Sequence, residues 1–496
     1  MKAIQILVVG GSWAGLKTAR ALQRRIGNAS IVIVTDAQTF PGGAGADNQA
    51  TLHHSAYFYA LWTMDVAEAA RKVSTLRADA ALLLEDIDDA QARINSKPGA
   101  LVCFTEEGAD YAIARIRQTT GIEPTFWSPK QFIRAPGAKT PVRIIQTTDV
   151  VYDKFRLAYF DLQQFIEAGG VVRTATRVTH IDSDGRIEWL KTPGQAKVTE
   201  FSRSGATVID DSGGEEKFDL VINTSGYGAA EIQGSWRSPG AFNLDIFQAG
   251  VLRAQGHVSH FPDASVVYAW NDGKQSLFTS QMHANSLPYP NSTYDVLTTF
   301  ALTDWTAKKV SIGALPNRMD VAQVQAIYDT LLSEAGGTHM ILMRQQGKLL
   351  PHPCYKINAN REGSSLQRNT DVTFVRTGAC TYLGLLGKAS HAHQLAQIVA
   401  DYFCSANIDA ALCPDWRYAA ENSNPPELRE RIMKSPSAIH IDGVIGEPQF
   451  EYSSKFSQAY GGALSQNRAR RILTEESIVD DPRLSQIYAE LIAEAA

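Results

Sequence analysis

The sequence predicts an α/β protein with three parts: a Rossmann-type domain, a second, β-rich domain with a mixed sheet, and a C-terminal extension. Three observations carry this prediction. Residues 4–36 follow the pattern strand, glycine turn, helix, strand, which is one βαβ unit. The apolar run at 218–223 is typical of a buried parallel strand, and that at 371–377 of a buried strand. Residues 240–360 are richer in aromatic residues and histidine and contain short strand-like runs.

The composition narrows the class of protein. The chain has 496 residues, of which 44% are hydrophobic and 20% charged, as in an ordinary globular protein of several domains. Its net charge of -5 argues against a nucleic-acid partner. The five cysteines form no CxxC pair, so neither a disulfide framework nor a metal site is expected. Without a leader pattern or an apolar run of ~18 residues, we expect a cytoplasmic protein with no integral membrane segment.

The first βαβ unit carries the most specific chemical signal. Ile4–Val9 predicts a buried strand, helical spacing of apolar residues follows from Leu16, and 31–34 predicts a second strand that leads to Asp36. The turn between strand and helix consists of Gly10, Gly11, Ser12, Trp13, Ala14 and Gly15. Glycines let the backbone approach a pyrophosphate, and the helix N-terminus attracts that anion. Asp36 can accept both hydroxyl hydrogens of an adenosine ribose. Ser12 stands where the middle glycine of this motif is usual.

The following segments predict alternating helices and strands. A loop of small and polar residues at 41–48 leads into 51–58, and such a loop lets backbone lie close to a ligand. The next predicted elements are a helix at 65–93, a strand at 100–104, a helix at 109–120, a strand at 143–147, a helix at 154–168, and strands at 171–173 and 177–181.

The second half predicts more strands. We expect a polar hairpin over 194–217 with its turn at 211–214, and then the buried strand at 218–223. Strands are expected at 265–270 and 276–280, a helix at 320–335, and a strand at 371–377. Gly378, Gly384 and Gly387 punctuate the loop after that strand, and a helix follows at 390–403.

Together these features resemble the FAD-dependent oxidoreductases of the D-amino-acid oxidase family, which includes glycine and sarcosine oxidases and 2-hydroxyglutarate dehydrogenases. The resemblance rests on five segments: 10–36, 48–58, 149–157, 219–226 and 377–387. It implies a discontinuous FAD-binding domain of residues 1–60, 140–230 and 365–405. A substrate domain of 61–139 and 231–364 and an extension of 406–496 complete the implied division.

The resemblance also implies site residues. His53 corresponds to the family histidine beside the flavin ring, and His54 is an additional one. Both are candidate catalytic bases, because the unperturbed pKa of histidine is near ~6.5. Beyond the first unit, FAD contacts are implied at Asn48, His53, Val178, Thr224, Gly226, Gly378, Gly384 and Gly387. Five basic residues are candidates for binding the carboxylate of a substrate: Arg344, Lys348, Arg361, Arg376 and Lys388.

The activity that the resemblance implies is hydride transfer from an amine, amino acid or 2-hydroxy acid to FAD, with reoxidation by oxygen or a quinone. Two alternatives stay open. Residues 224–227 are similar to the ATGY segment of N-hydroxylating monooxygenases, but their second dinucleotide fold is missing here, since Glu231 stands where a third glycine is needed. The long extension also suits a non-catalytic FAD-bound assembly or partner-binding protein. Substrate, acceptor, flavin attachment and oligomeric state stay open.

Overall fold

The structure of the chain is a computed structural model, and between residues 242 and 361 only the backbone of the strands is described. The described residues are 3–37, 52–53, 57–62, 65–90, 92, 98–131, 140–152, 154–195, 197–234, 242–255, 266–271, 274–283, 296–302, 308–310, 349–361, 372–386 and 391–404.

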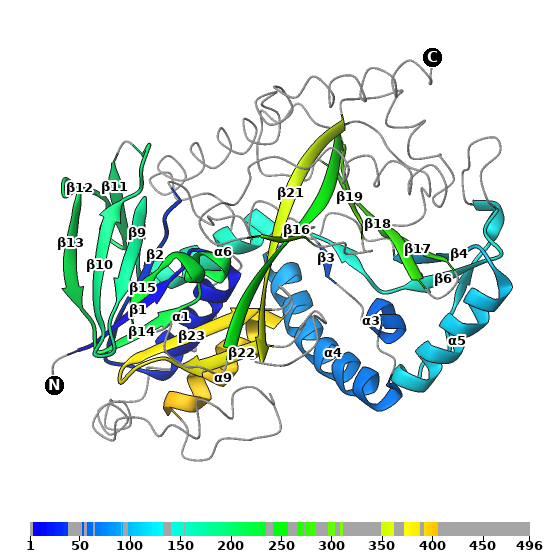
Figure 1. Cartoon of the computed structure of the whole chain (residues 1–496), viewed down its shortest axis with the longest axis horizontal. Helices are drawn as coiled ribbons and strands as arrows, with labels where there is room; N and C mark the ends of the chain where they lie inside the picture. Colours follow the sequence, from blue (N-terminus) through cyan, green and yellow to red (C-terminus); the bar gives the residue numbers. More distant parts are fainter. Residues whose placement is uncertain are drawn as a thin grey trace.

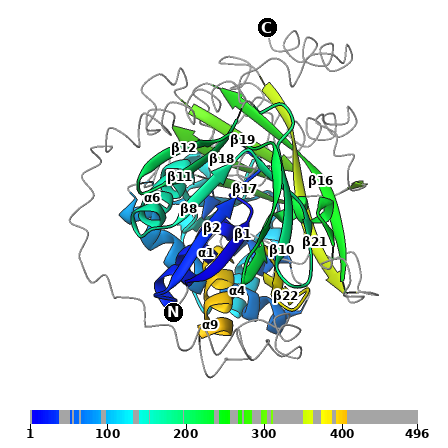
Figure 2. The ribbon, with the colours of Figure 1, turned by 90° about the vertical axis from the view of Figure 1, so that its left-hand side faces the viewer.

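An eight-stranded sheet forms the first part of the molecule, in the order β12-β11-β8-β2-β1-β14-β23-β22 (Figure 1). Its parallel centre consists of β8 (Val171–Thr174), β2 (Ala29–Val34), β1 (Ile4–Val9), β14 (Leu220–Asn223) and β23 (Thr381–Leu386). Antiparallel pairing adds β11 (Val198–Ser202) and β12 (Gly205–Ile209) at one edge, and β22 (Val372–Arg376) at the other. Figure 2 shows β8, β2 and β1 side by side. The predicted Rossmann-type α/β fold is confirmed.

Both faces of this sheet are covered, which explains the continuous apolar runs of its central strands. Ile6 and Val8 face a core built with three helices, α1 (Trp13–Arg25), α6 (Lys154–Glu167) and α9 (Ala392–Cys404). Leu7 and Val9 face the opposite core, against a four-stranded sheet. That sheet has the order β13 (Gly213–Lys217), β10 (Arg186–Lys191), β9 (Thr176–Ile181), β15 (Gln233–Gly234).

A nine-stranded mixed sheet forms the second part of the molecule. Its strands are β20 (Lys308–Val310), β16 (Phe242–Gln255), β19 (Val296–Leu302), β18 (Lys274–His283), β17 (Val266–Asn271), β4 (Gly99–Cys103), β6 (Arg143–Thr147) and β5 (Phe126–Trp127), with β21 (Leu349–Arg361) paired to β16. Within this sheet β17 and β4 pair in parallel, and all other neighbouring strands pair antiparallel. The predicted β-rich mixed sheet is therefore confirmed. Strand β6 joins it, although residues 140–230 were expected in the FAD-binding domain.

Three helices accompany the mixed sheet: α3 (Tyr57–Trp62), α4 (Val66–Asp89) and α5 (Glu106–Thr120). One short strand pair lies beside them. The Asp65 and Thr105 side chains cap α4 and α5 by accepting a hydrogen bond from a backbone N–H three residues on. The pair is β3 (Leu52–His53) with β7 (Val150–Val151). Short 3-10 turns occur at Pro129–Gln131 (η1) and Gly226–Glu231 (η2). No helix in the described ranges combines the length and apolarity needed to cross a membrane.

Two predicted loops are wrong, and close packing explains both. The polar hairpin is β11–β12, so its turn lies near residues 203–204 rather than 211–214. Gly213 and Gly214 instead lie in β13, where a Cβ on Gly213 would be 2.7 Å from the Leu190 side chain. Gly384 lies inside β23, where a Cβ would be 3.2 Å from Leu395 of α9. In both strands glycine permits close approach and does not mark a turn. The helix expected at 320–335 and the extension at 406–496 lie outside the described residues.

Candidate cofactor-binding site

The turn after β1 needs glycine at three positions for steric reasons. Gly10 has a φ of +117°, and a Cβ there would lie 2.8 Å from the Ser225 Cα and from the Thr224 carbonyl oxygen. A Cβ on Gly15 would lie 2.0 Å from the Gly10 carbonyl oxygen, and one on Gly11 would lie 2.6 Å from the Thr35 Cβ. The start of α1 therefore packs directly against the end of β1, with no space for a side chain between them.

Hydrogen bonds hold the end of β1 between its two neighbours. The Gly10 N–H donates to the Val34 carbonyl at 2.8 Å, which ties the turn to β2. The Val9 carbonyl accepts from the Thr224 N–H at 2.8 Å and from the Thr224 hydroxyl at 2.9 Å, which ties it to β14. The turn is thus fixed by hydrogen bonds to both neighbouring strands.

The N-terminus of α1 is not capped by its N-cap side chain. Ser12 is the N-cap residue in an extended conformation, with a φ of -107°, and its side chain makes no capping hydrogen bond. The Ser12 side chain thus accepts none of the N–H groups of the first turn, and the helix dipole favours an anion at this end. The Trp13 side chain is buried in an apolar cluster with Leu83, Ile87 and Tyr152. Trp13 can therefore contribute only its main chain to a ligand at this helix end.

Asp36 lies just beyond β2, where three strands converge. Its side chain is exposed. Thr35 donates its N–H to the Arg173 carbonyl at 2.9 Å, and its carbonyl accepts the Thr176 N–H at 2.8 Å, which links the end of β2 to β8 and β9. Val178 is buried with Val9 in the core between the sheets, so its side chain faces away from solvent. The exposed Asp36 carboxylate therefore lies at the same edge of the sheet as the glycine turn, beyond the end of the neighbouring strand β2.

The residues after β14 complete this edge of the sheet. The Asn223 Oδ1 accepts hydrogen bonds from the Ser225 N–H at 3.1 Å and from the Ser225 hydroxyl at 2.6 Å. Gly226 follows with a φ of +62° and opens η2. Asn223 is 2% exposed, and its Nδ2 has no hydrogen-bond acceptor among the described residues. A buried donor of this kind is costly unless a ligand or water satisfies it.

The second group of predicted residues lies at β3. His53 pairs in the antiparallel register with Val150 of β7, next to Asp149, which is 1% exposed. Burial raises the pKa of the Tyr57 phenol; the positive charge of Arg77 opposes this rise and the Asp149 carboxylate adds to it. Tyr57, Arg77 and Asp149 therefore lie within electrostatic reach of one another, and Asp149 directly precedes β7. His54 and Asn48 lie outside the described residues.

The glycine-rich segment near 378–387 begins with a tight turn that the protein's own contacts hold in place. A Cβ on Gly378 would lie 2.4 Å from the Thr381 hydroxyl, so glycine is needed for the tight turn between β22 and β23. The Arg376 guanidinium donates to the Gly378 carbonyl at 2.8 Å and to the Ala379 carbonyl at 3.2 Å. Arg376 thus uses these donors to close its own turn. Gly387 lies outside the part that the structure describes.

Sequence reasoning missed a buried charged cluster behind the glycine turn, formed by Lys17 and Arg20 of α1, Asp86 of α4, Asp161 of α6 and His393 of α9. Lys17 forms ion pairs with Asp86 and, at 2.6 Å, with Asp161, which also binds Arg20. His393 lies 2.5 Å from Asp86. Burial opposes ionisation of Asp86, but the His393 hydrogen bond and the Lys17 charge outweigh it and hold its pKa well below the ordinary value. The cluster joins all four helices.

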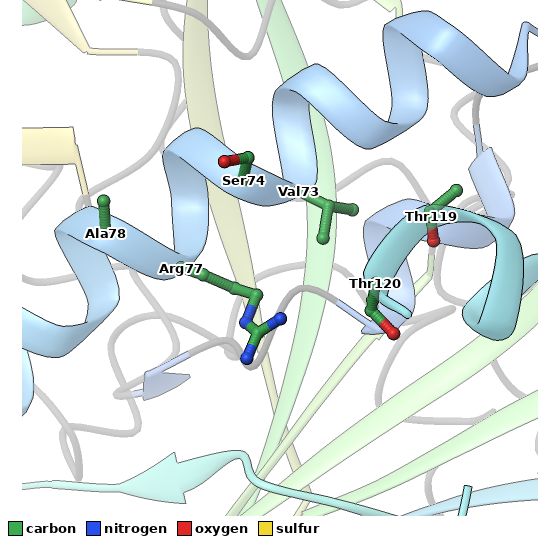
Figure 3. Close-up of a pocket in the computed structure, with 6 residues that line it drawn as sticks. All are labelled: Val73, Ser74, Arg77, Ala78, Thr119 and Thr120. Carbon is green, nitrogen blue, oxygen red and sulfur yellow. The ribbon is translucent and has the colours of Figure 1, made fainter. Parts of the chain in front are cut away.

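A separate cavity of about 410 Å³ lies between α4 and α5, lined by Val73, Ser74, Arg77, Ala78, Thr119 and Thr120 (Figure 3). The Thr119 and Thr120 hydroxyls donate to carbonyls of their own helix at 2.8 and 2.7 Å. Arg77 lies beside the carbonyl end of α5, which attracts a cation. This cavity presents Arg77 but no converging set of donors, and none of its lining residues comes from the nucleotide-binding sheet.

Two groups at one edge of the sheet could hold parts of a nucleotide. The uncapped start of α1 offers backbone N–H groups to an anion, and Asp36 offers an exposed carboxylate. Within the described ranges, no cluster of three or more histidine, cysteine or acidic side chains is suited to hold a metal ion.

Comparison with known proteins points to the same chemistry. The profile of the DAO family, described as FAD dependent oxidoreductase, matches residues 5–265. The fold is similar to glycine oxidase from Geobacillus kaustophilus, at 13% identity and a TM-score of 0.55, covering 83% of this chain and 98% of that one. It is also similar to L-proline dehydrogenase from P. horikoshii, at 10% identity and a TM-score of 0.52, covering 84% and 96%.

A third similar fold is that of fructosyl amine:oxygen oxidoreductase from Aspergillus fumigatus, at 14% identity and a TM-score of 0.53, covering 85% of this chain and 92% of that one. At these identities the likeness concerns the fold. No curated protein sequence matches the chain.

Proposed function

The chain belongs to the family of FAD-dependent oxidoreductases, and on this premise we propose that it oxidises a small amine, amino acid or 2-hydroxy acid. Its cofactor is FAD. The observation that carries the proposal is the glycine turn, in which Gly10 and Gly15 bring the open end of α1 directly against β1. The turn supplies the anion site that a dinucleotide cofactor requires.

The described residues suggest how FAD lies on the protein. The N–H groups from Gly11 to Gly15 face its pyrophosphate, and Asp36 accepts the ribose hydroxyls. Backbone at Val178 borders the adenine end, and Thr224 and Gly226 border the pyrophosphate from β14. The flavin ring would then extend toward β3, with His53 and Gly387 beside it, whereas Gly384 packs against α9 inside β23.

When bound, FAD accepts a hydride from the substrate carbon and passes the electron pair to oxygen or a quinone. The protein must take up the proton that the substrate nitrogen or oxygen loses, so that an amine leaves as an imine and a hydroxy acid as a keto acid. We assign this proton to His53 or His54, because a neutral imidazole accepts a proton near neutral pH. The substrate is expected in the mixed-sheet part of the molecule, 61–139 and 231–364.

The similar folds support an amine or amino acid as substrate. Glycine oxidase and L-proline dehydrogenase both act on small amino acids by name, and the fructosyl amine enzyme acts on a substituted amine. All three substrates carry a C–H bond next to nitrogen. We therefore rank amines and amino acids above 2-hydroxy acids.

Anaerobic mixing of the FAD-loaded protein with a substrate panel tests this proposal. The panel contains primary and secondary amines, D- and L-amino acids and 2-hydroxy acids, and bleaching of the flavin absorbance reports reduction. We expect at least one amine or amino acid to bleach the flavin. Admission of oxygen, or of a quinone under anaerobic conditions, should then restore the colour and identify the acceptor.

Two histidine variants test the assigned base. His53→Asn and His54→Asn should separate the two candidates, and loss of the general base should slow flavin reduction by roughly 10²- to 10⁴-fold while FAD stays bound. His180→Asn, on β9, is the matched control and should leave the reduction rate unchanged. A flavin that is readily photoreduced but that no panel member reduces would contradict the proposal and favour a non-catalytic FAD protein.

A further inference from the structure

Two histidines at the start of α9 bind two aspartates of α4, a helix that accompanies the mixed sheet. The Nδ1 of His391, which directly precedes α9, lies 2.6 Å from the Asp79 Oδ2, and the His393 Nε2 lies 2.5 Å from the Asp86 Oδ2. Asp79 and Asp86 are seven residues apart, about two turns of helix, so both project from one face of α4. These contacts join the two large parts of the molecule.

We propose that His391 and Asp79 are positioning residues for the FAD site. Their hydrogen bond fixes the start of α9 on α4, and the start of α9 in turn fixes the start of α1, the helix end that we assign to the pyrophosphate. The inference rests on the FAD cofactor of the family and is independent of the substrate proposed above.

The His391–Asp79 pair is buried where apolar residues would pack equally well. Asp79 is 6% exposed and His391 2%, and the neighbours of Asp79 on the buried face of α4 include Leu76 and Leu83. An ionised carboxylate only accepts hydrogen bonds, so the His391 Nδ1 carries the hydrogen of this bond. Apolar residues in place of a buried ion pair often give equal or greater stability. We therefore ascribe to this pair a contribution to geometry, because one hydrogen bond between two rigid groups allows a single placement of the two helices.

The start of α9 lies beside the glycine turn. Ala392, the first residue of α9, is buried in the same apolar cluster as Trp13, the first residue of α1. Trp13 directly follows Ser12, the N-cap residue of that helix. About one turn further along α1, Lys17 pairs with Asp86, the partner of His393. Contacts from α4 and α9 thus hold the first turns of α1 in place.

The opposite ends of α1 and α9 provide a control pair. Arg25, the last residue of α1, lies 3.1 Å from the Asp401 carboxylate of α9, and its side chain is 40% exposed. This ion pair joins the same two helices, but it lies roughly 18 Å along α1 from Trp13. Its loss should therefore leave the glycine turn undisturbed.

Four variants separate positioning from stability. The double variant His391→Leu/Asp79→Leu replaces the hydrogen-bonded pair by apolar side chains. His391→Asn keeps an N–H donor near the place of Nδ1, whereas His391→Gln carries its amide one bond further out. Arg25→Gln is the matched control. The melting temperature of each apoprotein and its dissociation constant for FAD are measured.

We expect the double-leucine variant to melt at or above the temperature of the wild type and yet to bind FAD about 10-fold more weakly. Only a fraction of its molecules then holds the start of α1 in the binding arrangement, and the apparent dissociation constant rises by the reciprocal of that fraction. His391→Gln should weaken FAD binding by a similar factor. His391→Asn and Arg25→Gln should stay within ~3-fold of the wild type, the former because it restores the hydrogen bond.

A double-leucine protein that is stable and binds FAD as tightly as the wild type would overturn the proposal. Equal FAD affinities of His391→Asn and His391→Gln would do the same, and this comparison decides the result if the double variant does not fold. A loss of FAD affinity that follows the melting temperature across all variants would show a purely structural pair. If the wild-type apoprotein binds no FAD, the cofactor assignment itself fails, and the pair has no such site to position.

Discussion

Replacing Gly15 with alanine adds one methyl group to the first turn of α1, and the structure predicts the sign of its effect. In an exposed helix this change stabilises the protein by about 1 kcal/mol, because alanine has the higher helix propensity. Here the new Cβ would lie 2.0 Å from the Gly10 carbonyl oxygen and 3.0 Å from the Thr224 hydroxyl. Ordinary C···O contacts are near ~3.3 Å or longer, so the turn must open by more than ~1 Å.

The expected cost follows from what must move. Opening the turn strains a packed site by about 1–3 kcal/mol. It also weakens the Thr224 bonds to the Val9 carbonyl, at 2.8 and 2.9 Å, and each such bond contributes about 0.5–1.5 kcal/mol. These losses exceed the gain in helix propensity, so the apoprotein should lose about 1–3 kcal/mol of unfolding free energy. Displaced N–H donors should weaken FAD binding by at least ~100-fold.

Urea unfolding of the apoprotein and a fluorescence titration with FAD measure the two effects. Gly169→Ala is the matched control, since Gly169 has a φ of +90° and no neighbouring atom within 4 Å of the position that the new methyl group would take. It should cost only backbone strain, about 1–2 kcal/mol, and leave FAD binding unchanged. A Gly15→Ala protein that is more stable than wild type, or that binds FAD equally well, would refute the steric reasoning.

Three further predictions concern stability. Lys17→Met removes one of the two cations that bind the buried Asp161 carboxylate, so the free energy of unfolding measured in urea should fall by about 3–5 kcal/mol. A loss below about 1 kcal/mol would show that the cluster is solvated. The folded protein holds the pKa of Asp86 below its ordinary value of 3.8, so the ionised carboxylate contributes its full stability above that pH and loses it as the pH falls toward the folded pKa. The difference in unfolding free energy between wild type and Asp86→Asn should therefore shrink below about pH 4; a constant difference would contradict this. Ala175→Gly should change the unfolding free energy by no more than about 1 kcal/mol, because relief of the φ of +53° is offset by loss of a fully buried methyl group and by the greater entropy of unfolded glycine; a loss above about 2 kcal/mol would contradict this.

The sequence predicted the elements whose signals are local. The pattern from Ile4 to Asp36 predicted β1, α1 and β2, because a strand covered on both faces and a helix with one apolar face differ in period. The glycines of the first turn were predicted to let backbone approach a pyrophosphate, which stays a prediction; the structure shows that Gly10 and Gly15 also pack too closely against Thr224 and the turn itself for a side chain to fit.

Features that depend on distant segments were not predictable in this way. Gly213 and Gly384 have the composition of a turn, and only the positions of Trp189, Leu190 and Leu395 show that these glycines lie in strands. Lys17 is another example, because a charged residue on a helix is usually exposed. Its burial follows from α4, α6 and α9 packing around α1, and its carboxylate partners lie 69 and 144 residues away in the chain.

The central claim is that the glycine turn after β1 binds FAD. Its most direct test is the visible spectrum of the purified protein, before and after acid precipitation, combined with calorimetric titration of FAD into apoprotein. We predict a flavin spectrum and saturable uptake of FAD, with the colour released into the acid supernatant if attachment is non-covalent and retained in the pellet if it is covalent. A colourless protein that shows no heat of FAD binding would contradict the account.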